Sequence, residues 1–406
     1  MFKLIQLLPK RPLLHMKKAR KNARTFLSQA YYCEDAWRQR LNSPLLQKIN
    51  LEEFYYELEQ RYQKSRSLNA LDIDIFANAI QNDQFCDEIL DLVHKLRLTA
   101  DTGNAPESMS HAVIRLLAQN QRFDDLLDAL DDRLNYGLFL DYFTANLLMD
   151  IFWKAKKYAH GARVASQLML QEELEHPLSN DLALLHCYNY LLKPEGWPVQ
   201  EPPVEPEEEI KIRVKYLRNP WNDDHFDLRE DKKIIGKTLA MIGKGKTDPL
   251  YQSFHILGLA LYQKPYNNIP VTTPLYKEIL DLLPEPHTFE TESIDVNTKL
   301  IDNVKNSFTK THQQDINQQC KIYQQWEQNR LKSMEDQKQR LHTAKRLENI
   351  KDLKQALKEK EEKLWFFENE EQIDLAIDAK TKFYPKRWFG HKKKPRHVDE
   401  GYIPPQ

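Results

Sequence analysis

The last part of the chain, residues 382–396, interleaves cationic and aromatic side chains in a pattern that suits contact with nucleic acid. Cations neutralise phosphates, and flat rings stack on unpaired bases. The segment contains prolines and has no helical periodicity, so it predicts an irregular tail that folds on a partner. A nuclear-localisation patch and a solvated run of charge are the alternative interpretations. The candidate RNA-binding residues of the tail are Lys382, Lys386, Arg387, Trp388, Phe389, Lys392, Lys393, Lys394 and Arg396.

A second candidate site is the run AMIGKGKT at residues 240–247, which fits a relaxed phosphate-binding loop with alanine in place of the first glycine. Such a loop needs a buried strand before it and a helix that starts at the lysine–threonine pair, because backbone amides must converge on the phosphates. Here the preceding residues have helical spacing, and Pro249 moves the next helix start beyond Thr247. We therefore interpret the run as a glycine-rich turn between helices.

No other pattern indicates catalysis or a bound cofactor. The sequence contains no GxSxG, no HExxH and no paired-glycine cofactor loop. Its 4 cysteines lie far apart and outside CxxC pairs, which favours buried free thiols over a zinc site or a disulfide framework. No apolar run approaches the roughly 18 residues that a membrane span requires. We expect no catalytic residues, no metal or other cofactor, no small-molecule substrate and no membrane partner.

The element around which the chain is organised is a helical hairpin at residues 136–169. Its first helix has one apolar face, formed by residues at three- and four-residue spacing. A polar break at residues 154–157 separates this helix from a second one, whose small residues allow close helix approach. The apolar face consists of Phe143, Leu147, Leu148, Ile151 and Phe152, and the small residues are Gly161, Ala162 and Ala165.

The apolar pattern of this hairpin also occurs about 35 residues upstream, and a period of this length is in the range of helical-hairpin solenoids. Val113 corresponds to Leu148, and Leu117 corresponds to Phe152, without a gap. Another hairpin is expected at residues 71–80 and 85–98, and a further first helix at residues 179–192. The pattern predicts stacked antiparallel hairpins, with the first helices packed against one another.

The run GLFLDYFTAN at residues 137–146 resembles the pentatricopeptide repeat, in which a glycine is followed by aspartate and then by threonine and asparagine at the start of a helix. Gly137, Asp141, Thr144 and Asn146 fall in register, whereas Lys156 stands where this family usually has glycine. The resemblance implies that the first helices line a concave surface on which side chains meet RNA bases. The RNA-binding repeat face that it implies consists of Thr144, Asn146, Lys154, Lys156 and Lys157.

A closer resemblance is to the pentatricopeptide-type proteins of the mitochondrial ribosomal small subunit. It rests on YGLFLDYFTANLLMDIFWKAKKY followed by LMLQEELEHP, and it continues in RNPWNDDHFDL and IIGKTLAMIG. The resemblance implies a structural role in the ribosome and a place in the mitochondrial matrix. The partners that it implies are mitochondrial small-subunit ribosomal RNA and other small-subunit ribosomal proteins.

The N-terminal residues are basic and contain no acidic residue before Glu34, which is typical of a matrix-targeting presequence. An uncleaved basic arm that binds RNA is the alternative. Cleavage is expected between residues 20 and 31.

The domain organisation that we expect follows changes in composition along the chain. The segments are residues 1–30, a presequence; 31–192, the repeat domain; 193–209, a Pro/Glu-rich linker; 210–306, a second helical region; 307–363, a long charged helix; and 364–406, the basic-aromatic tail. The charged helix keeps only an imperfect heptad, which favours an arm on a partner or a solvated helix over a homodimeric coiled coil. Two antiparallel helices remain an alternative for this segment.

These observations predict an all-α protein, in which a degenerate pentatricopeptide-type solenoid is followed by further helices and an irregular tail. The predicted function is a structural component of the mitochondrial ribosomal small subunit that supports mitochondrial translation. One alternative is a free RNA-processing factor that reads one base per repeat, although such readers need more regular repeats. The other is a helical-repeat adaptor that binds protein alone, which the basic-aromatic tail disfavours.

Overall fold

The computed structural model describes residues 26–198, 228–266, 274–284 and 289–380 of the chain. These residues are almost entirely helical, and the strands among them are the short parallel pair β1 (Leu275–Tyr276) and β2 (Thr291–Glu292). The expected all-α fold is confirmed. The α-helices are α1 (Glu34–Gln39), α2 (Leu51–Ser65), α3 (Ala70–Ala79), α4 (Cys86–Arg97), α5 (Glu107–Gln119), α6 (Phe123–Asp131), α7 (Arg133–Tyr136), α8 (Tyr142–Ala155), α9 (Tyr158–Leu170), α10 (Pro177–Leu192), α11 (Asp231–Gly243), α12 (Pro249–Leu261), α13 (Lys277–Leu280) and α14 (Val296–Lys380). Short 3-10 helices are η1 (Gln29–Tyr32), η2 (Arg40–Asn42), η3 (Leu46–Lys48), η4 (Asp83–Phe85) and η5 (Ala100–Asn104).

The chain divides into two compact units, residues 1–332 and residues 333–406. Unit 1 contains α1 to α13 and the first part of α14, and the described part of unit 2 is the remainder of α14. The helix is continuous from Val296 to Lys380, so the alternative of two antiparallel helices is wrong. It also begins before residue 307 and extends beyond residue 363, and residues 364–380, which were expected to be irregular, are helical.

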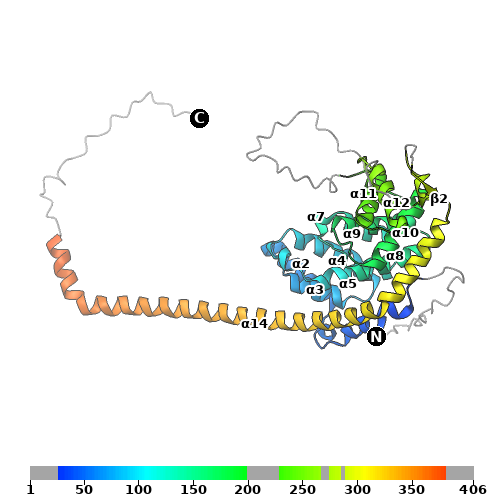
Figure 1. The fold of residues 1–406 in the computed structure, drawn as a ribbon. Helices are drawn as coiled ribbons and strands as arrows, with labels where there is room; N and C mark the ends of the chain where they lie inside the picture. Colours follow the sequence, from blue (N-terminus) through cyan, green and yellow to red (C-terminus); the bar gives the residue numbers. More distant parts are fainter. Residues whose placement is uncertain (1–25, 199–227, 267–273, 285–288, 381–406) are drawn as a thin grey trace, which may run out of the picture. The chain divides into compact units, whose positions relative to one another are not determined.

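Unit 1 is built from stacked helical hairpins, as the repeat pattern predicts. α3 packs against α4, α5 against α6, α8 against α9, and α10 against α11 (Figure 1). The first helices of these pairs contact one another in the order α3, α5, α8, α10, and the second helices α6, α9 and α11 do the same. No strand occurs between residues 107 and 192. Residues 26–198 therefore contain the expected solenoid, and α11 and α12 extend it within the same unit.

Local sequence signals set the ends of the central hairpin. Asp141 and Thr144 form a capping box at the start of α8, with the Asp141 carboxylate accepting from the Thr144 backbone N–H at 2.7 Å. Gly137 ends α7 at φ 63°, and Lys156 ends α8 at φ 57°. Both angles lie in the left-handed region that favours glycine, which explains the glycine usual at the Lys156 position in this repeat.

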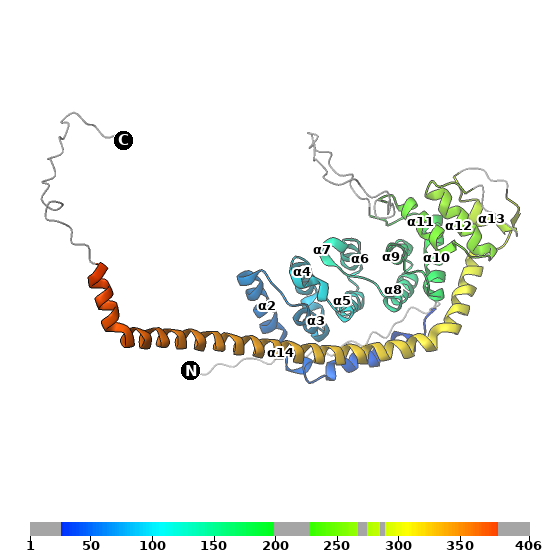
Figure 2. The same cartoon turned by 60° about the vertical axis from the view of Figure 1, so that its left-hand side comes forward.

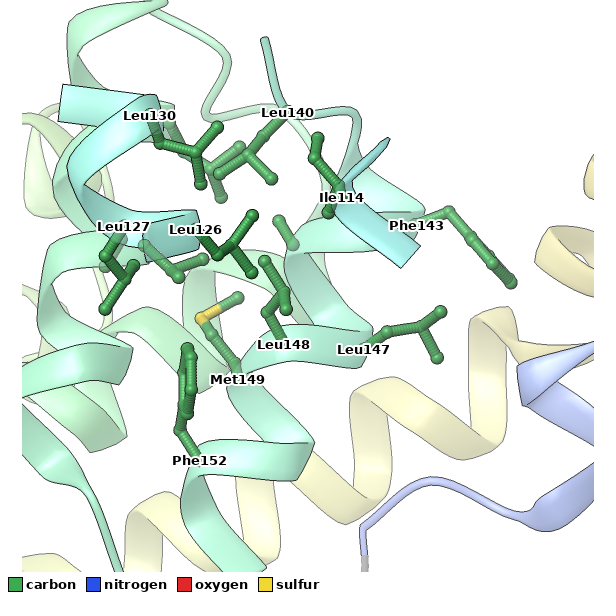
Figure 3. Packing of buried hydrophobic residues seen from close by; sticks show 14 of the residues in the cluster. Ile114, Leu126, Leu127, Leu130, Leu140, Phe143, Leu147, Leu148, Met149 and Phe152 are labelled. Carbon is green, nitrogen blue, oxygen red and sulfur yellow. The ribbon is translucent and has the colours of Figure 1, made fainter. Parts of the chain in front are cut away.

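The apolar residues of the predicted helical faces meet in one core. Figure 3 shows Leu148, Met149 and Phe152 of α8 directed towards the leucines of α6. Val113, Leu117, Leu148 and Phe152 are all buried in this cluster, as the alignment of the two hairpins predicts. The sequence predicts that the small residues bring α9 close to α8, but a Cβ atom added at Gly161 would lie 2.1 Å from His186 Nδ1 on α10. The close approach is to α10 rather than to α8.

α14 and the N-terminal segment lie along the first helices of the stack. In both views the yellow part of α14 runs down beside α10 and then beneath α8, α5 and α3, with the blue segment from residue 26 near it (Figures 1 and 2). Aromatic contacts join the two, with Tyr31 and Phe308 ring centroids 5.8 Å apart and Trp37 and Tyr323 5.3 Å apart. The surface of α3, α5, α8 and α10 that faces these segments is called the first-helix face below.

Candidate nucleic-acid interface

The residues expected to read RNA bases are buried on the first-helix face. Asn146 is 0% exposed, and its side-chain amide donates to the Tyr31 hydroxyl at 3.1 Å. Thr144 is 1% exposed and caps α8 together with Asp141. In this structure Thr144 and Asn146 are therefore enclosed by the chain itself and do not lie on an open surface. The physical reason is that the chain's own N-terminal segment and α14 occupy the surface on which bases would lie.

Asp150, one turn after Asn146 on α8, anchors the N-terminal segment. This carboxylate is fully buried and accepts from the backbone N–H groups of Phe26 and Leu27 at 3.0 and 3.4 Å. The Tyr32 hydroxyl donates to its other oxygen at 2.7 Å. Burial and the adjacent Asp150 charge raise the pKa of Tyr32, so the phenol stays protonated and keeps this hydrogen bond.

The lysines expected to contact RNA phosphates differ in their surroundings. Lys154 forms an ion pair with Asp150 at 2.5 Å and donates to the Tyr32 hydroxyl at 2.7 Å, so it belongs to the buried anchor. Lys157 is half-buried, with its ammonium 5.1 Å from the centre of the Phe123 ring. Lys156 is exposed at the C-terminal end of α8. Of these lysines, Lys156 has the greatest freedom to meet a phosphate.

A chain of polar contacts fastens the first part of α14 to the stack. Asp315 of α14 accepts from the Tyr31 hydroxyl at 3.0 Å and lies 3.2 Å from His176 Nε2 at the start of α10. Burial opposes ionisation of Asp315, but the bonds from His176 and Tyr31 outweigh it and lower the pKa of the carboxyl. Nearer the start of α14, Ser307 donates to the buried Asp181 of α10.

The next contacts lie around Tyr323, where α14 crosses α5. Arg115 donates to the Tyr323 hydroxyl at 2.9 Å and forms an ion pair with Glu34 at 3.1 Å. His111 Nε2 lies 3.0 Å from the same hydroxyl, and its ring contacts Trp326 at a centroid distance of 5.0 Å. Burial lowers the pKa of His111, so its imidazole is neutral near pH 7.

The last buried contact of α14 with the stack is an ion pair between Arg330 and Asp74. The Arg330 guanidinium donates to Asp74 of α3 at 2.7 Å, and both side chains are almost completely buried. Asn78 donates to the same carboxylate at 2.9 Å, and Ser108 of α5 also bonds to it. Because the charges are paired and hydrogen-bonded, the burial is tolerated, whereas removal of one partner would be costly.

The second candidate site, residues 240–247, lies where one helix ends and the next begins. AMIGKGKT forms the end of α11 and the turn to α12, which begins at Pro249 under a cap from Asp248. The prediction of a glycine-rich interhelical turn is confirmed. All cysteines are free thiols, with Cys33, Cys86 and Cys187 buried and Cys320 half-buried.

Neither a metal site nor a membrane span occurs in these ranges. No cluster of histidine, cysteine, aspartate or glutamate that could hold a metal ion occurs among the described residues. In the same part of the chain, no helix is both long and apolar enough to cross a membrane.

A groove of 1160 Å³ opens in unit 1 beside the N-terminal ends of α5 and α8. Its charged lining carries both signs, with Arg97 and Arg133 near Glu107, Asp132 and Glu173. A phosphate-binding groove would be lined mainly by cations. The lining therefore does not favour this groove as a path for RNA.

A comparison of the sequence with protein-family models identifies the family. The family model described as mitochondrial 28S ribosomal protein S27 matches residues 4–284 and 277–356. The chain belongs to the mitochondrial 28S ribosomal protein S27 family. Membership makes it a mitochondrial protein and a component of the ribosomal small subunit. Proteins of this family have a structural role and no known enzymatic activity.

Sequence reasoning missed that the first part of α14 packs on the first-helix face of this S27-family chain; the row of α14 side chains that makes these contacts is called the seam below. The signal was present in α14, where buried and half-buried side chains recur at three- and four-residue spacing. They are Val296, Leu300, Val304, Phe308, His312, Asp315, Gln319, Tyr323, Trp326 and Arg330. Several of them are polar, so an apolar heptad search passes over the stripe even though it is buried.

Two regions of this S27-family protein remain as candidate contact surfaces. The first region consists of the tail residues expected to bind RNA, from Lys382 to Arg396, which lie outside the described residues. Residues 1–25 of the expected presequence and residues 199–209 of the expected linker also lie outside them. The second region is the C-terminal part of α14. Residues 333–380 of α14 are described, and almost all of their side chains are exposed.

Proposed function

We propose that the chain is a structural protein of the small ribosomal subunit in the mitochondrial matrix, where it binds ribosomal RNA and neighbouring proteins and supports translation. RNA affinity comes from cations and aromatic rings of the tail, with Lys156 as an additional contact, and the stacked hairpins act as a scaffold. Phosphate contacts of this kind give affinity without base specificity.

The occupied first-helix face is the observation that carries this proposal. A free pentatricopeptide-type reader needs open first helices that present one set of side chains per repeat. Here Asn146 bonds to Tyr31 instead, and α14 covers the same face through Asp315, Tyr323 and Arg330. A sealed face favours a fixed position in a ribonucleoprotein over sequence reading.

The proposal is tested by co-sedimentation of the tagged full chain with the mitochondrial small subunit across a salt series. Replacement of Lys392, Lys393, Lys394 and Arg396 by Glu should weaken association sharply at low salt. If those residues meet phosphates, the slope of log K against log salt should become shallower by about 3. Reversal of four exposed cations elsewhere, Lys48, Lys64, Lys193 and Lys244, changes the net charge equally and should have a much smaller effect.

Asn146→Ala separates the proposed role from that of a sequence reader. Its side chain is enclosed, so the variant should sediment like the unsubstituted chain, provided that circular dichroism confirms that it is folded. Release of this variant from the subunit, combined with normal binding of the tail variant, would establish base reading and overturn the proposal.

A further inference from the structure

The C-terminal end of α14, residues 364–378, carries a dense group of exposed apolar side chains. Trp365 is 59% exposed and Phe367 is 68% exposed, although both are among the side chains that proteins most often bury at contacts. The group includes the large exposed residues Leu364, Trp365, Phe366, Phe367 and Leu375. Aromatic clusters of this kind on an exposed helix mark protein contact surfaces.

The arrangement of these side chains around the helix argues against self-association of this segment as a coiled coil. Four consecutive residues, from Leu364 to Phe367, cover about 300° of the helix circumference at 3.6 residues per turn. A coiled coil buries a single stripe of a and d positions, so a second copy of this helix would leave part of the group in water. A partner that reaches around the helix fits better.

Charge changes sign along this part of α14. The 364–378 segment is acidic, whereas residues 338–363 before it are rich in cations. The acidic residues are Glu368, Glu370, Glu371, Asp374 and Asp378. The preceding cations are Lys338, Arg340, Lys345, Arg346, Lys351, Lys354, Lys358, Lys360 and Lys363. Carboxylates repel phosphates and attract lysine and arginine, so the acidic segment disfavours RNA and favours a basic protein.

The local geometry suits an arginine side chain. Glu359 and Glu362 line a shallow depression together with Lys363, Phe366 and Phe367. The Phe366 and Phe367 rings meet edge to face, with centroids 5.8 Å apart. The guanidinium group of an arginine can stack on an aromatic ring and hydrogen-bond to a carboxylate at the same time. The methylene groups of the arginine side chain can also pack against the rings.

We propose that residues 364–378, together with the preceding Glu359 and Glu362, bind a basic, arginine-containing segment of a neighbouring small-subunit protein. This inference deepens the proposed function and rests on it, because the partner is a neighbour within the subunit. The aromatic residues supply the buried anchor, and the carboxylates select the charge of the partner.

A photo-crosslinking experiment on the full chain tests the proposal. p-Benzoylphenylalanine replaces Phe366, the tagged protein is expressed in cells, and the small subunit is isolated on a gradient and irradiated. The expected product is a crosslink that survives nuclease and joins α14 to a protein peptide in which Lys and Arg outnumber Asp and Glu. The same reagent at Leu341, which is 58% exposed on the cationic part, should not label that peptide.

A charge variant tests the role of the carboxylates. Glu368→Lys, Glu370→Lys and Glu371→Lys together should reduce the crosslink yield at position 366 by at least about tenfold. A matched triple change on the same helix, Glu335→Lys, Asp336→Lys and Glu348→Lys, should leave the yield unchanged. These side chains are exposed, so folding of unit 1 is preserved in both variants.

Several outcomes would overturn the inference. In the crosslinking experiment, they are a crosslink to RNA, to a second copy, to residues 382–396 of the same chain or to a peptide without excess basic residues. The absence of any crosslink in the subunit fraction would also overturn it. In the charge variant, the overturning outcome is an unchanged crosslink yield. Absence of the chain from the small subunit would overturn the proposed function as well. Presence in the subunit with a crosslink to RNA would overturn this inference alone.

Discussion

Phe152 occupies the centre of the α8 core and touches two aromatic neighbours. Its ring lies edge-on to Phe123 at 5.2 Å and to His160 at 5.3 Å between centroids, and it is fully buried. Phe152→Ala should lower the free energy of unfolding by about 3–5 kcal/mol, because it leaves a cavity. Urea titration followed by circular dichroism measures the loss. Phe139→Ala, at a half-exposed position, should lose far less, and equal losses would contradict the assigned packing.

His186 makes the stability of the repeat stack dependent on pH. Its Nε2–H donates to the Met149 carbonyl at 2.9 Å, and burial lowers its pKa to about 4. An unfolded histidine titrates near pH 6.5, so between these values the unfolded state binds more protons. The contribution of His186 to stability is therefore complete above about pH 6.5 and declines as pH falls towards about 4, by about 3 kcal/mol in total.

Urea unfolding at pH 7 and pH 4 checks this expectation. His186→Gln should reduce the difference in unfolding free energy between the two pH values, whereas His342→Gln, at an exposed position of α14, should leave the difference unchanged. If the His186→Gln variant keeps the full pH dependence of the unfolding free energy, the buried neutral imidazole is not the cause of that dependence.

Residues of the apolar faces could be predicted from spacing, but the roles of polar residues could not. Phe152 and Leu148 are buried because their own helix and the one before it carry matching apolar stripes. Asn146 has the residue type and repeat position of a base reader, yet it bonds to Tyr31, which lies far away in the sequence. Short-range patterns contain no information about a partner that only tertiary folding brings near.

At the scale of elements, the ion pair between Arg330 and Asp74 fixes α14 to α3. Arg330→Met leaves the Asp74 carboxylate buried without its cation, which costs about 3–5 kcal/mol when a buried pair is broken. We expect this part of α14 to open more often, so that amide hydrogens around residues 319–330 exchange at least about 100-fold faster. Hydrogen exchange with mass spectrometry measures the rate.

Two variants control this experiment. Lys338→Met, at an exposed position of the same helix, should leave exchange unchanged. The double variant Arg330→Met and Asp74→Asn removes both charges and should recover part of the protection, because no unpaired buried charge remains. Equal exchange in Arg330→Met and the unsubstituted chain would show that the ion pair does not hold α14 in place.

Helix positions followed from the sequence, whereas the docking of α14 did not. Asn50 caps α2, Asp248 and Pro249 start α12, and the turn after Gly243 ends α11, all through local chemistry. The seam of α14 instead combines apolar, aromatic and charged residues with partners on α3, α5 and α10. Each contact joins residues that are distant in sequence. Helical periodicity can therefore locate the buried stripe on α14, but it cannot identify the helices that pack against it.

At the scale of the whole molecule, the N-terminal segment from residue 26 and the part of α14 up to residue 332 complete unit 1. Both close the surface that the open stack would otherwise expose, and the contacts of Asp150 and Asp315 show that this closure is polar as well as apolar. The candidate contact surfaces proposed above are therefore α14 after residue 332, whose side chains are almost all exposed, and the tail residues predicted to bind RNA.

Closure by the N-terminal segment sets a limit on where an import presequence can be removed. Phe26 and Leu27 are buried, the Phe26 ring lies 5.3 Å from Trp153, and both backbone amides bond to the buried Asp150. Cleavage after Leu27 would remove these donors and expose part of the core. We expect the mature protein to begin at or before Phe26, within residues 20–26, which N-terminal peptide mapping of the mitochondrial protein determines. A mature N-terminus beyond Leu27 would contradict the assigned anchor. A chain lacking residues 1–25 should stay outside the matrix. The Phe26→Ala variant should still be imported, but its folded state should be less stable.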